Sequence, residues 1–343
     1  MADEPAPESL ARSDSKASPP SGSAGVPQPH DRYFRASLQG VEEQIALIGA
    51  LFPMLAPRLE VDGVSPLDGT FVDDDLTQRQ TDVVLQARLA GREVIIYVLI
   101  EHQSSVDPLM AVRLHRYQSR IWDRYIRAHP GTTTAPLILP AVVYHGSRPW
   151  TAPTDLGEVL GLDAETVAEL GNRVPRMLYD VDDLTQIDLA ALRERSLPTP
   201  LLVPLALLMQ VARSPDLLGF LETLADDFTK LAAGRHGQRH LSAAFTYIVS
   251  VSNISTEQLR PFAHRLGPVV QEALMTTAEK LRAEGRAQGR AEGQAEFLME
   301  LLIMKFGPQP VNIRARVFTA TSDQLHAWTR RILPATTIDE VLD

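Results

Sequence analysis

Cysteine is absent from this sequence of 343 residues, which excludes disulfide bonds, thiolate metal sites and a cysteine nucleophile. An excess of positive charge is also lacking: 33 Lys and Arg stand against 43 Asp and Glu, so the formal net charge is -10. A chain this acidic has no overall attraction to nucleic acid or to an anionic membrane. Any contact with a polyanion therefore requires a local basic patch.

Long hydrophobic runs are missing as well. The most apolar stretches, Val94–Ile100 and Leu201–Met209, are far shorter than the roughly 20 residues of a membrane-spanning helix. Asp3 and Glu4 stand at the N-terminus without an apolar stretch after them. We therefore expect no signal peptide, no contact with a membrane and a cytoplasmic location. A glycine-rich phosphate loop is also absent, so ATP dependence is not indicated.

The composition predicts five segments. Residues 1–27 are mostly Pro, Ser, Ala and Gly and are expected to be a disordered tail. Residues 28–150 predict an α/β core with a mixed sheet flanked by helices, and residues 151–266 predict a mainly helical extension. Residues 267–296 are expected to be an Ala/Gly-rich helical linker, and 297–343 a small C-terminal helical unit. The repeat AEGRAQGRAEGQAE within the linker fits a flexible connector and a seam for homo-oligomers equally well.

Within the predicted core, helical spacing of apolar residues predicts a helix over residues 30–59. Thr81–Leu89 and Glu93–Glu101 are rich in β-branched residues and predict a hairpin that turns around Ala90–Gly91. A helix is predicted from Asp107–Pro108 to about Ala128, followed by a buried strand at Leu137–Tyr144. In the later part of the chain, amphipathic helical pieces are predicted at Leu217–Leu231 and Leu241–Val251.

Two carboxylates meet in the predicted hairpin. If Ala90–Gly91 is the turn, Asp82 faces Leu99 and Glu101 is its diagonal neighbour; if Gly91–Arg92 is the turn, Asp82 faces Glu101 directly. Both registers put the two residues on one face of the sheet. Paired carboxylates at the end of a buried strand fit Mg²⁺ or Mn²⁺, which prefer oxygen ligands. Spacing alone fits equally well with two strand-end residues that reach solvent.

The stretch TDVVLQARLAGREVIIYVLIEHQSSVDPLMAVRLHRYQSRIWDRY, with PHDRYFR before it and LPAVVYHGSRPW after it, resembles the Rpn (YhgA-like) family. These proteins are recombination-promoting nucleases, also labelled transposases, of the PD-(D/E)xK nuclease superfamily. The resemblance covers roughly residues 28–265. It implies a restriction-endonuclease-like core and Mg²⁺-dependent cleavage of double-stranded DNA.

The same resemblance assigns roles to single residues. The metal-binding aspartate of the family falls on Asp82 and its second acid on Glu101, while Gln103 stands where the superfamily has a lysine. A glutamine can orient a water molecule by hydrogen bonding but supplies no charge. A third acidic ligand is usual in the superfamily, and the sequence leaves four candidates open: Glu42, Glu43, Asp68 and Asp73.

The helix predicted after Gln103 carries an arginine stripe, spaced by three or four residues: Arg113, Arg116, Arg120, Arg124 and Arg127. At 100° per residue these side chains fall within an arc of roughly 80°. Beside a nuclease motif the stripe suits contacts with the DNA backbone, and a solvated helix face explains it equally well. Upstream, Asp31 is expected to cap a helix N-terminus.

Two functions follow from these residues. The first is a Mg²⁺-dependent endonuclease linked to recombination or mobile elements, with Asp82, Glu101 and Gln103 as its catalytic residues. The alternative is a DNA-binding or oligomeric assembly protein that keeps a nuclease scaffold but does not cut.

Overall fold

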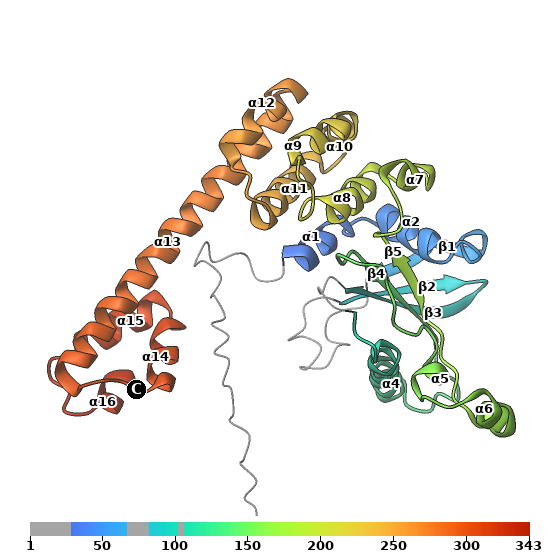
Figure 1. Ribbon diagram of the computed structural model, residues 1–343, viewed down its shortest axis with the longest axis horizontal. Coiled ribbons are helices and arrows are strands. Elements are labelled where there is room, and N and C mark those ends of the chain that lie inside the picture. The colour runs from blue at the N-terminus through green and yellow to red at the C-terminus, as the bar shows by residue number, and fades with distance from the viewer. Residues whose placement is uncertain (1–28, 67–81, 102–105) are drawn as a thin grey trace, which may run out of the picture.

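The computed structural model describes residues 29–66, 82–101 and 106–343 of the chain (Figure 1). The expected disordered tail, residues 1–27, lies outside these ranges. A single five-stranded sheet forms with the strands side by side in sequence order. Its strands are β1 (Leu59–Pro66), β2 (Asp82–Leu89), β3 (Arg92–Glu101), β4 (Leu137–Tyr144) and β5 (Asp180–Asp183). The first three strands are antiparallel, whereas β3, β4 and β5 are parallel, which confirms the expected α/β fold with a mixed sheet.

The hairpin of β2 and β3 has the first of the two predicted registers. Ala90 and Gly91 both have positive φ, 50° and 75°, as a two-residue hairpin turn of type I′ requires. Asp82 therefore pairs with Leu99, and the pairing continues without a bulge to Leu89 and Arg92. Because β3 and β4 are parallel, Glu101 at the end of β3 pairs with Tyr144 at the end of β4.

Helices cover both faces of the sheet. On one face lies α4 (Met110–Ala128), the connection between β3 and β4. Leu114, Tyr117 and Ile121 of α4 are buried against Val142 and other sheet residues. The opposite face of the sheet packs against α1 (Pro29–Ser37), α2 (Val41–Leu51) and α8 (Thr199–Gln210) in the largest hydrophobic core.

Several predicted elements were wrong in extent. The helix expected over residues 30–59 is divided into α1 and α2, and α2 begins after Gly40, where a Cβ atom would collide with the Glu43 carboxylate. The piece expected at Leu217–Leu231 is divided at Leu224 into α9 (Leu217–Thr223) and α10 (Ala225–Ala233). Strands β1 and β5 were not predicted at all. Acidic β5 is held at the sheet edge because Arg195 binds Asp182 through two hydrogen bonds of 2.7 and 2.9 Å.

The remaining elements are helices, which lie beside the sheet, in the helical body that follows it or in the C-terminal unit. They are η1 (Ala56–Arg58), α5 (Leu156–Val159), α6 (Ala164–Leu170), η3 (Gly171–Arg173), α7 (Leu189–Glu194), α11 (Gly237–Val251), α12 (Thr256–Leu266), α13 (Pro268–Phe306), α14 (Val311–Phe318), α15 (Ser322–Arg331) and α16 (Ile338–Leu342). Among the described residues, no helix has both the length and the apolar character needed to cross a bilayer.

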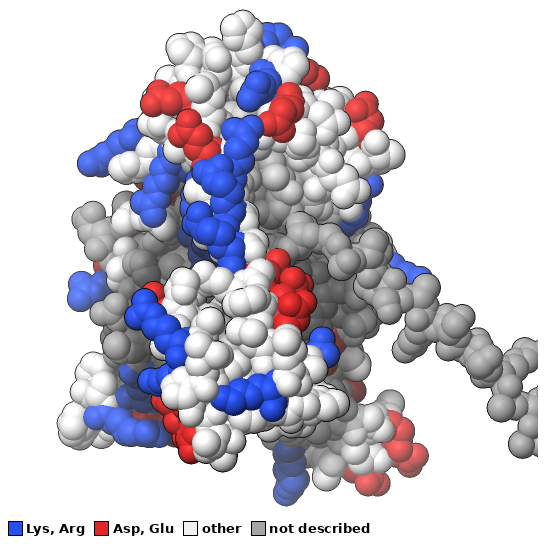
Figure 2. All heavy atoms as spheres, turned by 90° about the vertical axis from the view of Figure 1, so that its left-hand side faces the viewer, with Lys and Arg blue, Asp and Glu red and all other residues white. Residues whose placement is uncertain are grey.

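The Ala/Gly repeat forms the middle of α13, a helix of 39 residues. In Figure 1 this orange helix runs from the helical body to the C-terminal unit, where its last turns pack with α14, α15 and α16 in a separate hydrophobic cluster. A Cβ atom on Gly285, Gly289 or Gly293 would meet nothing within 4 Å. Figure 2 views the molecule from this side and shows a vertical band of Lys and Arg side chains between the helical body and the C-terminal unit.

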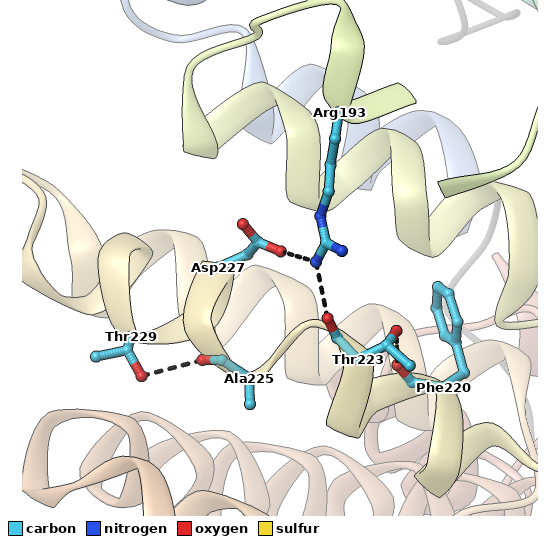
Figure 3. A network of polar contacts seen from close by, with 6 residues as sticks. All are labelled: Arg193, Phe220, Thr223, Ala225, Asp227 and Thr229. Carbon is cyan, nitrogen blue, oxygen red and sulfur yellow. Dashed lines mark hydrogen bonds and ion pairs between the residues drawn. The ribbon is translucent and has the colours of Figure 1, made fainter. Parts of the chain in front are cut away.

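An ion pair between exposed Arg193 and buried Asp227 joins α7 to the helices after it (Figure 3). The Arg193 guanidinium donates to Asp227 Oδ2 at 2.6 Å and to the main-chain oxygen of Thr223 at 2.7 Å. Asp227 is only 7% exposed, so its carboxylate depends on this arginine for much of its solvation. One guanidinium thus fixes α7 against the junction of α9 and α10.

Replacing Arg193 with methionine is expected to lower the free energy of unfolding by about 2 kcal/mol, because a buried carboxylate then loses a charge-assisted hydrogen bond. Chemical denaturation followed by circular dichroism measures this change. The matched control is Arg235→Met, since Arg235 is exposed and forms no ion pair with another described residue. Equal stability of the two variants would contradict the expectation.

Candidate functional site

The candidate site lies at the edge of the sheet where β3 and β4 end. Asp82 opens β2 and Glu101 closes β3, and the register makes these two positions diagonal neighbours. By strand alternation both positions belong to the face that carries α4, together with Val84 and Val142. The side chains of Asp82 and Glu101 and the whole of Gln103 lie outside what the structure describes, so their catalytic roles stay predictions.

The side chains beside this edge are described and form a rigid wall. Tyr144, the register partner of Glu101, is fully buried and meets the Trp150 ring edge to face, with 5.0 Å between the ring centroids. Asp183 pairs with Tyr144 from the other side in β5. The Asp183 carboxylate accepts hydrogen bonds from the main-chain N–H of Trp150 at 2.8 Å and from the main-chain N–H and the hydroxyl of Thr185 at 2.9 and 2.7 Å. Asp183 therefore fixes the loops around the edge.

No sequence pattern singled out Asp183, which lies in the unpredicted strand β5. Its carboxylate accepts three hydrogen bonds from the chain around it, so it has a structural role at this edge. Among the described side chains, no three His, Asp or Glu residues are grouped as a metal ion requires.

Of the four candidates for a third acidic ligand, the structure describes two. Glu42 is exposed in the first turn of α2, whereas Glu43 is buried, and its Oε2 atom has no hydrogen-bond partner within the described part of the chain. Burial lowers the pKa of His240, and the negative charge of Glu43 partly offsets that effect. Asp68 and Asp73 lie outside the described residues. The choice between these acids stays open.

The arginines of the α4 stripe differ in how far their side chains are exposed to solvent. Arg116 and Arg127 are exposed, Arg120 and Arg124 are half-buried, and Arg113 lies 3.8 Å from Asp107. The stripe is thus not a uniformly solvated helix face.

A second polar cluster, which sequence reasoning missed, joins α1 and α11 to the end of β4. His30 Nδ1 lies 2.9 Å from the Tyr247 hydroxyl, and the His30 ring lies 4.8 Å from the His145 ring. Arg213, at the end of the α8 segment, donates to the main-chain oxygen of His145. Because His145 directly follows Tyr144, this cluster reaches the sheet at the edge where β3 and β4 end.

Burial dominates the electrostatics of this cluster. It raises the pKa of Tyr247 and, together with the nearby Tyr247, that of Tyr33, so both phenols stay protonated. Burial also lowers the pKa of Arg213. Asp31 is fully buried within the first turn of α1, and its expected role as an N-terminal cap stays a prediction. The signal in the sequence for this cluster is the segment PHDRYFR, which places several polar residues in one short helix.

Comparison with known proteins gives one family and several relatives. The family model described as "Putative transposase, YhgA-like" matches residues 28–239. Recombination-promoting nuclease RpnA of Escherichia coli (strain K12) is 29% identical over 269 residues, which cover 75% of this chain and 84% of that protein. Recombination-promoting nuclease RpnD of Escherichia coli O157:H7 is 26% identical, with coverage of 74% and 94%.

A third relative carries a different description. Inactive recombination-promoting nuclease-like protein RpnE of Escherichia coli (strain K12) is 28% identical over 219 residues, which cover 63% of this chain and 68% of that protein. No solved structure matches the chain significantly.

Proposed function

The chain belongs to the YhgA-like family, and on that premise we propose that it is a metal-dependent endonuclease that hydrolyses phosphodiester bonds of double-stranded DNA. Relatives described as recombination-promoting nucleases support the proposal at 26–29% identity. The single observation that carries it is the register of β2 and β3, which makes Asp82 and Glu101 diagonal neighbours where β2 begins and β3 ends.

The residues present fit a divalent cation. Two carboxylates on one sheet face form a hard-oxygen donor set of the kind that Mg²⁺ or Mn²⁺ takes, and Asp82 and Glu101 would hold the ion. Bound there, it would lower the pKa of a water molecule and stabilise charge on the phosphoryl group. The parallel end of β3 and β4 and the wall of Tyr144 and Trp150 fix the strand that carries Glu101.

The other residues of the proposed site position the substrate and the attacking water. The Gln103 amide forms a hydrogen bond with that water and so orients it. It does not add the positive charge that a lysine would supply. Arg116 and Arg127, the exposed members of the α4 stripe, contact the DNA backbone electrostatically. These assignments put the core in the PD-(D/E)xK class.

The proposal is tested by plasmid cleavage. Supercoiled plasmid incubated with the full chain is expected to be nicked or linearised when Mg²⁺ is present and to stay intact when EDTA removes the cation, with a difference in rate on the order of 100-fold or more. Readdition of Mg²⁺ in excess of the chelator restores cleavage. Equal cleavage with and without the cation would rule out metal-dependent hydrolysis.

A second candidate function has specific support. RpnE is described as inactive, and Gln103 supplies none of the positive charge of the superfamily lysine. A DNA-binding or assembly protein on the nuclease scaffold would bind duplex DNA but leave the plasmid intact under every cation condition. The plasmid assay therefore separates the two candidates.

A further inference from the structure

A pocket of about 410 Å³ lies between α1, α11 and α13, away from the two hairpin carboxylates in sequence. Helix α1 contributes Arg32 and Tyr33, α11 contributes Arg239 and Tyr247, and α13 contributes Lys280. The three helices are in direct contact, since α11 packs against both α1 and α13. The pocket is therefore a built feature of the helical body.

The charge of this pocket is opposite to that of the whole chain. Arg32, Arg239 and Lys280 line it, and no described lining residue is acidic. Arg32 and Arg239 are exposed and form no ion pair with another described residue. Lys280 forms an ion pair with Glu284, one turn along the same helix at 3.9 Å, and both side chains are largely exposed, so water weakens the pair. Two arginines without an ion pair to another described residue, together with Lys280, whose pair with Glu284 is exposed, create a local positive potential in a protein whose net charge is -10.

Hydrogen-bond donors stand beside these cations. Tyr33 is 5% exposed, lines the pocket, and its hydroxyl has no hydrogen-bond partner among the described residues. Burial keeps this phenol protonated, because it raises the pKa of Tyr33. Thr246 and Ser250 already donate to carbonyl oxygens of their own helix, at 2.7 and 2.6 Å. Ser242 and Thr276 form no such side-chain bond with the described residues and remain as donors.

We propose that this pocket binds a backbone phosphate of a nucleic-acid strand, an inference that rests on the proposed action on DNA. Cations with neutral donors and no acid are the chemistry that recognises a phosphate group. The rings of Tyr33 and Tyr247 stack on each other at 4.5 Å and are almost fully buried, so neither offers a face to a nucleobase. The site thus suits the phosphate of a strand better than a free nucleotide.

The surroundings favour an extended ligand. Farther along α13 the chain carries Arg286 and Arg290, whereas Arg282 is paired with Glu257 at 2.6 Å, and Figure 2 shows a basic band on this helix's side of the molecule. On the inner side, Tyr247 connects through His30 to His145, next to the register partner of Glu101. The pocket is thus linked on its inner side to the end of β3 and β4, where the proposed cleavage site lies.

The experiment measures binding without cleavage. The full chain is titrated against a fluorescent 20-base-pair duplex in EDTA at several salt concentrations, and anisotropy gives the affinity. The variant Arg32→Gln/Arg239→Gln/Lys280→Gln is expected to bind at least about 10-fold more weakly, with a slope of log affinity against log salt that is smaller by about 2 to 3. Tyr33→Phe removes only the hydroxyl and is expected to weaken binding by about 3-fold.

The matched control is Arg173→Gln/Arg314→Gln/Arg330→Gln, which removes the same charge from three exposed arginines outside the pocket. Its affinity is expected to change less than about 2-fold. Equal losses in the two triple variants, or no binding of the duplex by the unmodified chain, overturn the proposal. So does a result in which thymidine monophosphate binding depends on the pocket residues but duplex binding does not, because the ligand is then a free nucleotide.

This outcome is independent of the nuclease assay. If the pocket variant binds the duplex as well as the control does while the unmodified chain still cuts with Mg²⁺, only the pocket proposal fails. If the pocket variant loses binding but the unmodified chain never cuts, only the proposed hydrolysis fails.

Discussion

Glu101→Gln and Asp82→Asn are each expected to lower the rate of Mg²⁺-dependent plasmid cleavage on the order of 100-fold or more. Each change removes one negative charge from the proposed cation site while it keeps the size of the side chain, so the loss reports on ligand chemistry. In metal enzymes, even the substitution of a residue that only hydrogen-bonds to a metal ligand typically lowers activity or metal affinity about 10- to 100-fold. Gel electrophoresis of the plasmid over time measures the rate, with Mg²⁺ in excess.

The matched control is Glu165→Gln, which makes the same chemical change on the exposed surface of α6 and is expected to cut at the unmodified rate. Both site variants should still bind the duplex in EDTA, since neither removes a basic residue. Undiminished cleavage by both variants would remove Asp82 and Glu101 from the mechanism.

Phe228→Ala is expected to lower the free energy of unfolding by about 3 to 5 kcal/mol, the largest stability effect that we predict. Phe228 in α10 is fully buried and lies between two other rings, Phe245 of α11 at 5.9 Å and Phe262 of α12 at 5.4 Å between centroids. Its removal leaves a cavity where three helices meet. For a body of this size the melting temperature is expected to fall by roughly 10 °C, which circular dichroism measures.

Phe297→Ala serves as the control, because Phe297 in α13 is 54% exposed. The same atoms are deleted there from a site that water already reaches, so the melting temperature is expected to move by about 1 °C. A shift for Phe228→Ala no larger than that of Phe297→Ala would contradict the assignment of this ring as a core residue.

The hairpin could be predicted closely from the sequence because its determinants are local. β-branched residues on both sides of Ala90–Gly91 set the strands and narrowed the register of Asp82 to two alternatives, of which the structure has the pairing with Leu99. The predicted strand Leu137–Tyr144 has the same bounds in the structure. Long apolar runs of this kind are buried in almost any fold that contains them.

Elements that depend on distant partners were missed. Strand β5 reads DVDD and has no apolar alternation; it forms because the edge of β4 supplies its hydrogen bonds and Arg195 neutralises Asp182. The site at the sheet edge followed from the motif, but its supporting residue Asp183 did not. The pocket of Arg32, Arg239 and Lys280 brings together residues that are far apart in the sequence, since more than 200 positions separate Arg32 from Arg239. No local sequence pattern can therefore reveal it.

The length of helix α13 sets both the distance and the orientation of the C-terminal unit relative to the helical body. Its 39 residues span about 58 Å, and the repeat in its middle touches little else. Because each residue of a helix adds about 1.5 Å and 100°, the length of this repeat determines both the distance of α14 to α16 from the helical body and the direction in which they face. One residue inserted among the glycines would turn the unit by more than a quarter circle, whereas four would nearly restore its heading at about 6 Å greater distance.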